Sequence, residues 1–236
     1  MKATNAFAVA ALAFAALLSG CATTGGRGGV DDPFEASNRV MFQINEPLIE
    51  YVAKPVAEAY TTIVPSFMRT AVNNYVNNID DLFSILNDAL QGKWDKMGND
   101  MGRVMINTAF GFAGLIDIAS DAGIPRGMED FGQTFGYWGI PQGPYLFIPL
   151  WGPTTVRDGT GSILRLLWSP TNEIPNVPVR NVVYGLVTVN EAPGAVDAWK
   201  LVDQAALDRY TFVRRAYLQR REYLVHDGKP PPEKDE

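Results

Sequence analysis

The chain has 236 residues, enough for one domain with a substantial core, and its 47% hydrophobic and 19% charged residues exclude disorder over most of its length. A formal net charge of −6 disfavours nucleic-acid binding, which needs a basic surface against phosphates. The single Cys and single His exclude a disulfide framework, and a Cys/His zinc site or a Cys–His catalytic pair would need these two residues to meet. We therefore expect no metal, no cofactor and no catalytic residue.

The N-terminus has the pattern of a bacterial lipoprotein signal. Lys2 precedes an apolar run of 13 residues (6–18), which is shorter than the roughly 20 residues that a membrane-spanning helix needs. Small residues then lead to Cys21, the position at which such signals are cleaved and acylated. We expect residues 1–20 to be removed and residues 21–31 to form a lipidated, Gly-rich flexible tether. The alternative is an ordinary signal peptide with an incidental Cys.

The first half of the mature chain predicts three helical stretches. Asp32, Pro33 and Glu35 form a helix start, and apolar residues follow at helical spacing as far as residue 56. Pro47 and Pro55 should kink or divide this helix. A second helix should run from residues 65–66 to the glycine at 92, and a third from 94 to 110.

The second half predicts shorter elements and a long final helix. Residues 110–118 are apolar and Gly-rich, but the acidic residue at 117 excludes a spanning helix. We expect a short helix at 129–138, a loop or hairpin at 143–153, and a helix at 155–168 capped by Thr155. Residues 181–189 fit a helix or a strand, residues 195–225 a long charged amphipathic helix, and residues 226–236 a polar disordered tail.

Residues 131–151 are unusually rich in aromatic side chains. Seven of the 21 are aromatic, against 11% of the whole chain, and glycines recur at gaps of four, three and four residues. Small residues at this spacing allow backbones to approach closely, and Trp and Tyr favour the boundary between apolar and polar phases. The segment is either a buried core loop or a segment that lies in a bilayer or lines a lipid path. The predicted lipid anchor favours the second interpretation.

Charged residues give weaker signals. Glu129 and Asp130 are adjacent, so on a helix they do not face each other, and helix caps explain them better than an acid–base pair. His226 begins the polar tail and should be solvated. A basic stretch near the C-terminus is either a solvated helix face or a contact for anionic lipid headgroups or an acidic partner, and it consists of Arg209, Arg214, Arg215, Arg220 and Arg221.

Taken together, these segments resemble the MlaA (VacJ) family of outer-membrane lipoproteins from residue 32 to about residue 225. The resemblance depends on motifs in a shared order: Asp32-Pro33-x-Glu35-x-x-Asn38-Arg39-x-x-Phe42; Arg103 with Asn107-Thr108, Gly111, Gly114 and Asp117; Glu129-Asp130-Phe131-Gly132-Gln133-Thr134 with Trp138-Gly139; Gly143-Pro144-Tyr145-Leu146 with Pro149, Gly152-Pro153 and Arg157-Asp158; and Tyr210, Arg214, Tyr217 and Arg221.

The resemblance implies a mainly α, ring-like multi-helix lipoprotein, embedded in the periplasmic leaflet of the outer membrane of a Gram-negative bacterium. A Gly/Pro-rich hairpin loop would line its central channel. Such a protein removes mislocalised phospholipids from the outer leaflet and passes them to a periplasmic carrier protein, which maintains lipid asymmetry. The implied partners are phospholipid, a trimeric porin and the carrier, and no nucleic acid.

The resemblance and the aromatic segment together give candidate site residues. The candidates for the lipid channel are Gly139, Gly143, Pro144 and Tyr145, and those for membrane contact are Phe110, Phe112, Phe131, Trp138, Phe147 and Trp151. Pro141 stands where some relatives have Gly, and we expect this proline to make the loop stiffer. Two alternatives remain: a structural lipoprotein associated with porins, and a lipid-hydrolysing enzyme. Against the enzyme stand the lone His226 and the lack of a G-x-S-x-G motif.

Overall fold

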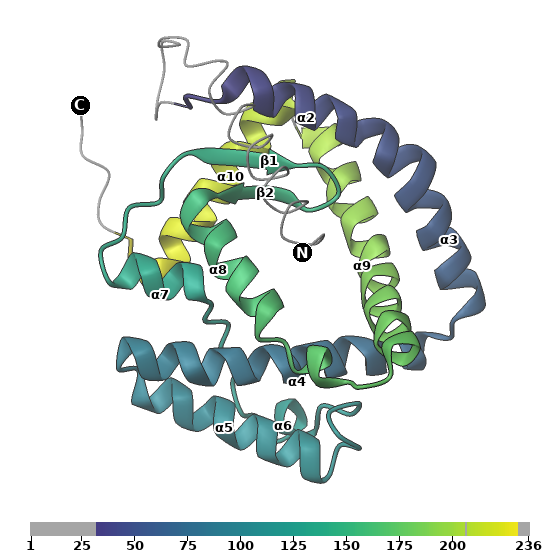
Figure 1. Ribbon diagram of the computed structural model, residues 1–236, viewed down its shortest axis with the longest axis vertical. Coiled ribbons are helices and arrows are strands. Elements are labelled where there is room, and N and C mark those ends of the chain that lie inside the picture. The colour runs from purple at the N-terminus through teal and green to yellow at the C-terminus, as the bar shows by residue number, and fades with distance from the viewer. Residues whose placement is uncertain (1–31, 206, 231–236) are drawn as a thin grey trace, which may run out of the picture.

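The computed structural model describes residues 32–205 and 207–230, which form a mainly helical protein (Figure 1). The predicted signal peptide, the acylation site Cys21, the tether and residues 231–236 lie outside the described residues. Within the described part of the chain, no helix combines the length and the apolar character needed to cross a membrane.

The elements follow one another along the chain with one short antiparallel hairpin among the helices. In order they are α2 (Glu35–Leu48), the π-helix η1 (Ile49–Ala53), α3 (Lys54–Ile63), α4 (Ser66–Gln91), α5 (Trp94–Ala109), α6 (Ile118–Asp121), α7 (Phe131–Tyr137), β1 (Tyr145–Ile148), β2 (Gly152–Thr155), α8 (Val156–Leu167), the 3-10 helix η2 (Pro170–Glu173), α9 (Val177–Ala205) and α10 (Arg209–Val225).

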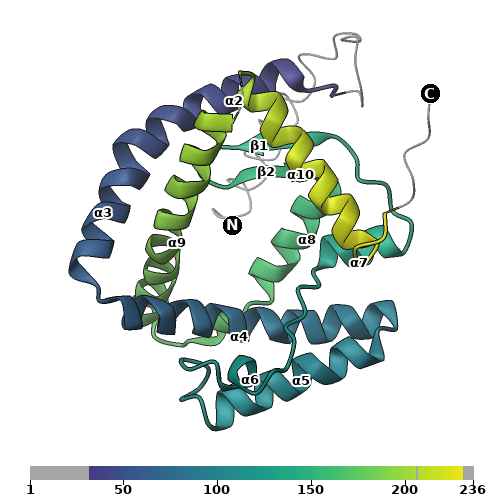
Figure 2. The same cartoon turned by 180° about the vertical axis from the view of Figure 1, so that it is seen from behind.

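The long elements are laid out as a ring. The rod from α2 through η1 to α3 forms one side, and α9 runs along it (Figures 1 and 2). Helix α4 forms the side opposite the hairpin, with α5 packed along it. The β1–β2 hairpin, α7 and α10 complete the ring, and α8 runs from the hairpin towards α4. The expected mainly α architecture is confirmed.

Most predicted helix boundaries are confirmed, since local signals set them. Gly92 ends α4 in the left-handed conformation (φ +72°). Thr155 caps α8 by accepting a hydrogen bond from the Asp158 N–H. The predicted division near Pro47 and Pro55 takes the form of a π-helix: α2 continues through Pro47, and α3 begins with Pro55 in its first turn. Backbone angles stay helical across both junctions, so the prolines change the hydrogen-bonding pattern of the rod.

The predicted helix at 195–225 is wrong in its boundaries. Helix α9 starts at Val177, continues through Pro193 and ends at Ala205, and α10 starts at Arg209. Asp208 caps α10 by accepting a hydrogen bond from the Thr211 N–H at 3.2 Å. The same carboxylate also forms an ion pair with Arg39 of α2 at 2.8 Å. The second contact joins residues far apart in the sequence, so local periodicity could not reveal the break.

The disordered tail expected from residue 226 is wrong for residues 226–228, which form a turn that ion pairs hold against the start of α5. The Asp227 carboxylate accepts from Lys93 at 2.7 Å and from Lys96 at 2.5 Å. His226 is partly solvated, as expected, and its Nδ1 lies 2.9 Å from the Glu222 carbonyl oxygen.

Two asparagines of α2 fasten the hairpin to the ring. The Asn38 side chain donates to the Tyr145 carbonyl at 2.9 Å and accepts from the Phe147 N–H at 3.0 Å. The Asn45 side chain accepts from the Leu150 N–H at 2.8 Å, at the turn of the hairpin. Both asparagines are buried, and they satisfy backbone groups that a two-stranded sheet leaves unpaired at its edge.

The largest apolar cluster among the described residues lies where the first and last helices of the ring, α2 and α10, meet the hairpin. Phe42 of α2 packs against Phe147 of β1 and against Trp199 of α9, with ring centroids 5.1 and 5.0 Å apart. Tyr145 and Tyr210 complete this cluster. A smaller cluster of Ile49, Ala57 and Val196 joins the rod to α9.

We expect Asn38→Ala to lower the free energy of unfolding by about 1–3 kcal/mol, because it leaves a buried N–H and a buried carbonyl without partners. Thermal or denaturant unfolding of the detergent-solubilised protein measures the change. Asn99→Ala is the matched control and should leave stability nearly unchanged, because this exposed side chain of α5 forms none of the hydrogen bonds found among the described residues. Equal stability of the two variants would contradict the assigned role of Asn38.

Candidate functional site

The described residues place polar side chains inside and apolar side chains outside. Twenty-two polar or charged residues are buried, against twelve hydrophobic ones, and the most deeply buried large side chains are all polar, beginning with Arg103, Gln133 and Asn87. At the same time, 39 large hydrophobic residues are exposed. Proteins in water bury apolar side chains preferentially, and an apolar surface of this extent marks contact with lipid or with another protein.

Helix α5 shows this inversion within one element. Its buried residues are Asp100, Arg103 and Asn107, which recur at helical spacing and face α4 and the following loop. Trp94 and Met105 are 64% and 67% exposed. The polar stripe was readable in the sequence as charged and amide residues at i, i+3 and i+7, but periodicity alone cannot say which face of a helix turns inward.

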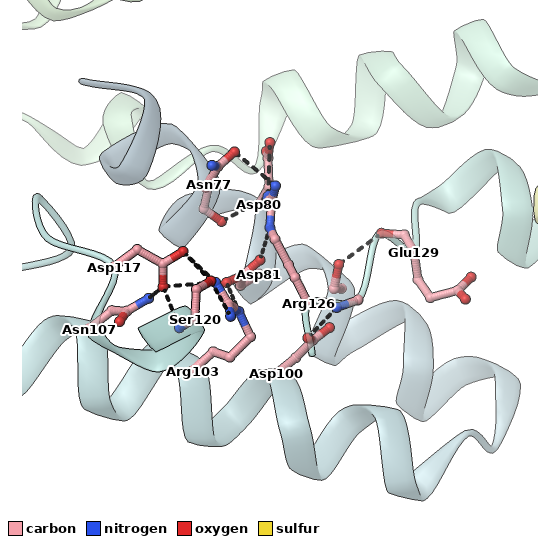
Figure 3. Close-up of polar contacts among 12 residues, drawn as sticks. Asn77, Asp80, Asp81, Asp100, Arg103, Asn107, Asp117, Ser120, Arg126 and Glu129 are labelled. Carbon is pink, nitrogen blue, oxygen red and sulfur yellow. Dashed lines mark hydrogen bonds and ion pairs between the residues drawn. The ribbon is translucent and has the colours of Figure 1, made fainter. Parts of the chain in front are cut away.

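The buried Arg103 organises the polar interior (Figure 3). Its guanidinium forms ion pairs with Asp81 of α4 at 3.2 Å and with Asp117 at 3.0 Å, and it donates to the Ile124 carbonyl at 2.9 Å. Arg126 binds the other oxygen of Asp81 at 2.6 Å. Burial alone would raise the pKa of Asp117, but hydrogen bonds from Ser120, Asn107 and Arg103 outweigh it and lower that pKa to about 2.

A second network joins α7, α8 and α10. Arg221 binds Asp130 through two hydrogen bonds of 2.6 and 2.9 Å and lies 3.0 Å from Asp158, to which Tyr217 also donates at 2.9 Å. Burial raises the pKa of Asp130, and the hydrogen bond and charge of Arg221 reverse this shift and lower it. Gly132 permits the contact, since a Cβ there would lie 2.6 Å from an Asp158 oxygen.

The basic stretch of α10 is therefore neither a uniformly solvated face nor a free cationic surface. Arg214 and Arg221 are buried, and Arg214 lies 3.5 Å from the Asp32 carboxylate. Arg209 forms ion pairs with Glu46 and Asp203. Asp130 caps α7, as predicted, by accepting from the Gln133 N–H, whereas Glu129 accepts from Lys93 and Lys96 and caps no helix.

The predicted channel residues lie between the end of α7 and the start of β1 and differ in exposure. Gly139 and Gly143 are exposed and adopt φ values of +83° and +71°, which favour glycine. Pro144 is half-buried, and its carbonyl accepts from the Val156 N–H at 3.1 Å. Tyr145 is 3% exposed and packs against Tyr210, so the structure corrects its assignment as an open channel-lining side chain.

The predicted membrane-contacting residues fall into two groups. Phe110, Phe112, Trp138 and Trp151 are between 52% and 74% exposed. Phe131 and Phe147 are each 4% exposed and pack in the interior, so they are removed from the candidate surface. The aromatic segment thus contains both a buried core and an exposed edge, so the buried-loop interpretation holds for part of it, and contact of the exposed part with lipid stays a prediction.

Strained backbone holds one part of the exposed surface. Phe112 and Ala113 adopt left-handed φ values of +52° and +58°, which cost free energy for residues other than glycine. The loop folds back onto α5, since Gly114 N–H donates to the Asn107 carbonyl at 2.9 Å. This conformation directs Phe110 and Phe112 outward, where they are 72% and 74% exposed.

A cavity of about 410 Å³ lies among α4, the hairpin, α8 and α10, inside the size range of ligand pockets. Aromatic residues contribute to its wall, and Trp151 and Arg165 line it while remaining exposed, so the cavity opens to the outside of the fold. Charged residues of both signs face it: Arg126, Arg165 and Arg221 with Asp80, Glu129, Asp130 and Asp158. Sequence analysis missed most of these residues, because they come from four separate segments. Among residues 32–205 and 207–230, no three His, Cys, Asp or Glu side chains are grouped to hold a metal ion.

Asp88 and Asp100 are fully buried acids on the facing helices α4 and α5. No N–H or hydroxyl donor among the described residues reaches either oxygen of Asp88 or Oδ2 of Asp100, so a hydrogen bond between these two carboxyl groups needs a proton on one of them. Oδ1 of Asp100 accepts the Gly127 N–H at 2.8 Å. Burial, together with the negative charges of Asp100 and Glu129, raises the pKa of Asp88 to about 7, although Lys96 and Lys93 act in the opposite direction. Asp88 therefore carries a proton in the folded protein over a pH range in which the unfolded chain is ionised.

We expect Asp88→Asn to be more stable than the unchanged protein at pH 8, with a difference that shrinks towards pH 5. The folded protein holds a proton that the unfolded chain releases, so stability falls by up to about 1.4 kcal/mol per pH unit between about pH 4 and 7 and then levels off. The amide stays neutral and removes this dependence. Thermal unfolding across pH 5–8 measures it, with the exposed Asp95→Asn as control. Parallel pH profiles for the Asp88→Asn and unchanged proteins would refute the raised pKa.

Comparisons with known proteins agree on one family. The family model described as MlaA lipoprotein matches residues 30–224. The intermembrane phospholipid transport system lipoprotein MlaA of Haemophilus influenzae is 32% identical over 226 residues, which is 93% of this chain and 90% of that protein. An uncharacterized protein of Rickettsia conorii is 36% identical over 135 residues, and this match spans about half of each chain (57% of this one, 54% of the relative).

A solved structure gives the same result for the fold. Reported as the structural basis for maintenance of bacterial outer membrane lipid asymmetry, it matches with a TM-score of 0.72 and 30% identity, over 83% of this chain and 100% of that chain. The family match covers most of the chain, and the motifs of the hairpin and of the buried networks fall inside it. The chain belongs to the MlaA lipoprotein family.

Proposed function

We propose that this protein is an outer-membrane lipoprotein that removes mislocalised phospholipids from the outer leaflet and passes them to a periplasmic carrier. The observation that carries the proposal is the inverted surface: the most deeply buried large side chains are polar, while 39 large hydrophobic residues are exposed. The family supports it, because the Haemophilus relative is named for intermembrane phospholipid transport.

The inverted surface suits a protein that sits in one leaflet. Exposed apolar side chains lose little when their surroundings are lipid tails, and backbone groups satisfied within helices can lie at that depth. Because the described helices are too polar or too short to span a bilayer, the body would rest in the periplasmic leaflet, held there also by acyl chains on Cys21. The mass of the mature protein tests acylation at Cys21.

A polar interior also suits the transported molecule. A phospholipid carries a polar head and two apolar tails, and moving the head through hydrocarbon is costly unless polar groups accompany it. The networks around Arg103 and Arg221 place charged side chains on either side of the cavity beneath the hairpin. The hairpin and its Gly/Pro loop would border the route, and no step of the transfer requires a nucleophile.

A trimeric porin and a periplasmic lipid carrier are the proposed partners. Exposed apolar residues on the outer face of α5, such as Met101 and Met105, offer a surface for lipid or for a membrane protein. If the protein only scaffolded a porin, porin binding would be kept while loss of the protein left surface phospholipid unchanged. If it were a hydrolase, lipid bound to the purified protein would be recovered as cleaved products.

The body should bind membranes without its anchor. A variant lacking residues 1–21 is expected to co-sediment with liposomes or to require detergent, because four candidate aromatic residues and many aliphatic ones stay exposed. Flotation with vesicles measures binding. A second variant with Phe110→Ser and Phe112→Ser should float less efficiently. A truncated protein that stays monomeric in buffer and ignores vesicles would overturn the proposal of a leaflet-embedded body.

Function should depend on the loop at Gly143. Gly143→Leu forces a side chain into left-handed backbone, where its Cβ would lie 3.2 Å from the Val156 Cβ, and it adds bulk beside the proposed route. We expect excess phospholipid in the outer leaflet, assayed by labelling lipid on intact cells, at normal protein level and with porin still bound.

Gly123→Leu is the matched control for this experiment. Gly123 has a similar φ of +75° and open space around it, so the same backbone strain arises away from the hairpin. It should restore lipid asymmetry in a strain lacking the protein. If Gly143→Leu also restores asymmetry at normal protein levels, the loop is not part of the route.

A further inference from the structure

An incompletely satisfied ion pair faces the cavity beneath the hairpin. Arg165 of α8 donates from both Nε and Nη2 to the same oxygen of Asp80, Oδ1, with Nε at 2.9 Å. Arg165 Nη1 and Asp80 Oδ2 form none of the hydrogen bonds found among the described residues, and the Arg126 Nη2 lies 3.9 Å from Asp80 Oδ2. The two side chains are 45% and 34% exposed, and both line the cavity. A donor on a cation and an acceptor on an anion are therefore left available side by side.

Arg126 lies close to this pair without hydrogen-bonding to it. Each of its three guanidinium nitrogens donates to another group, with Nε on Asp81 at 2.6 Å and Nη1 and Nη2 on Asn77 at 2.8 and 3.2 Å. Asp81 is in turn shared with the buried Arg103 (Figure 3). The remaining hydrogen-bonding capacity of Arg165 and Asp80 is thus open to a ligand in the cavity.

The charge of the cavity restricts that ligand. Three arginines and four carboxylates line it, and one of these carboxylates, Glu129, is also paired with Lys93 and Lys96 outside the lining. The lining therefore presents charges of both signs side by side, which suits a ligand with one charge of each sign better than a ligand with a single charge. Phe83, Phe131 and Trp151 supply apolar wall beside the charged groups, as an amphipathic molecule requires.

We propose that this cavity is a headgroup site that prefers zwitterionic phospholipids bearing a primary ammonium, with Arg165 on the phosphate and Asp80 on the ammonium. The inference rests on the proposed function and names the lipid class that the site selects. An arginine donor matches a phosphate oxygen, and a carboxylate oxygen matches an ammonium N–H. The Arg165–Asp80 pair places this donor and this acceptor next to each other, just as the phosphate and the ammonium lie next to each other in such a headgroup.

Competition among lipids tests the preference. The protein, purified from membranes in detergent, is equilibrated with equal amounts of phosphatidylethanolamine, phosphatidylcholine and phosphatidylglycerol of identical acyl chains, and bound lipid is quantified by mass spectrometry. We expect about threefold more bound phosphatidylethanolamine than phosphatidylglycerol, because a half-exposed ion pair gives a preference of only a few fold. Phosphatidylcholine should fall between them, because it is zwitterionic but has no N–H for Asp80.

Two variants and a control identify the residues. Asp80→Asn removes the acceptor charge and should bring the ratio near one while the total bound lipid is kept. Arg165→Gln removes the phosphate donor and should lower total binding at limiting lipid. Asp197→Asn breaks an exposed ion pair with Lys200 on α9, away from the cavity, and should change neither quantity.

The outcomes separate the two proposals. If the unchanged protein binds no phospholipid, the proposed transport function fails. If it binds lipid in the ratio of the mixture, or if Asp80→Asn keeps the full preference, the headgroup site is overturned while lipid transport stands. The comparison among the three lipids needs no variant, so it remains decisive even if Asp80→Asn does not fold.

Discussion

Burying charge in this protein depends on placing at least one carboxylate beside each buried arginine. Arg103, with 1% of its side chain exposed, shows this constraint most clearly: it binds Asp81, Asp117 and the Ile124 carbonyl at once. A buried ion with a partner removed costs several kcal/mol. The position of α6 and of the loops on either side of it therefore depends on this one guanidinium. The position of Arg126, which lines the cavity, is coupled to it because both arginines bind Asp81.

Closure of the ring depends on a similar arrangement where its first and last helices meet. The Asp32 carboxylate accepts from the Tyr210 hydroxyl and lies 3.5 Å from Arg214, while Asn38 holds the hairpin strand between α2 and α10. Phe42 packs beneath these polar contacts. Hydrogen bonds and ion pairs thus join residues nearly 180 positions apart. Because these polar contacts help to close the ring, only a small apolar cluster is buried at this junction.

Placing the apolar residues outside has consequences for chemistry as well as for location. Most polar side chains in the interior share hydrogen-bond partners, which fixes their positions. The polar groups that retain an unused donor or acceptor are therefore few. The Arg165–Asp80 pair faces an open cavity, whereas Asp88 is buried between α4 and α5 beside Asp100, and no donor from another described residue reaches its oxygens. The Arg165–Asp80 pair is accessible to a ligand, whereas the buried Asp88 makes the stability of the protein depend on pH.

The sequence alone determined the family, the mainly α fold and most helix boundaries, because Gly92, Thr155 and the prolines act through their own backbone within a few residues. It also predicted that residues 143–153 form a loop or hairpin. Only the tertiary structure decided which face of each helix is buried, that α9 passes through Pro193 and stops before Asp208, and that Phe131, Tyr145 and Phe147 are internal. These features depend on contacts between residues far apart in the chain, such as Asp208 with Arg39 and Asp80 with Arg165. Periodicity shows that a helix has a polar face and an apolar face, but the partners and the surrounding medium decide which of the two points inward.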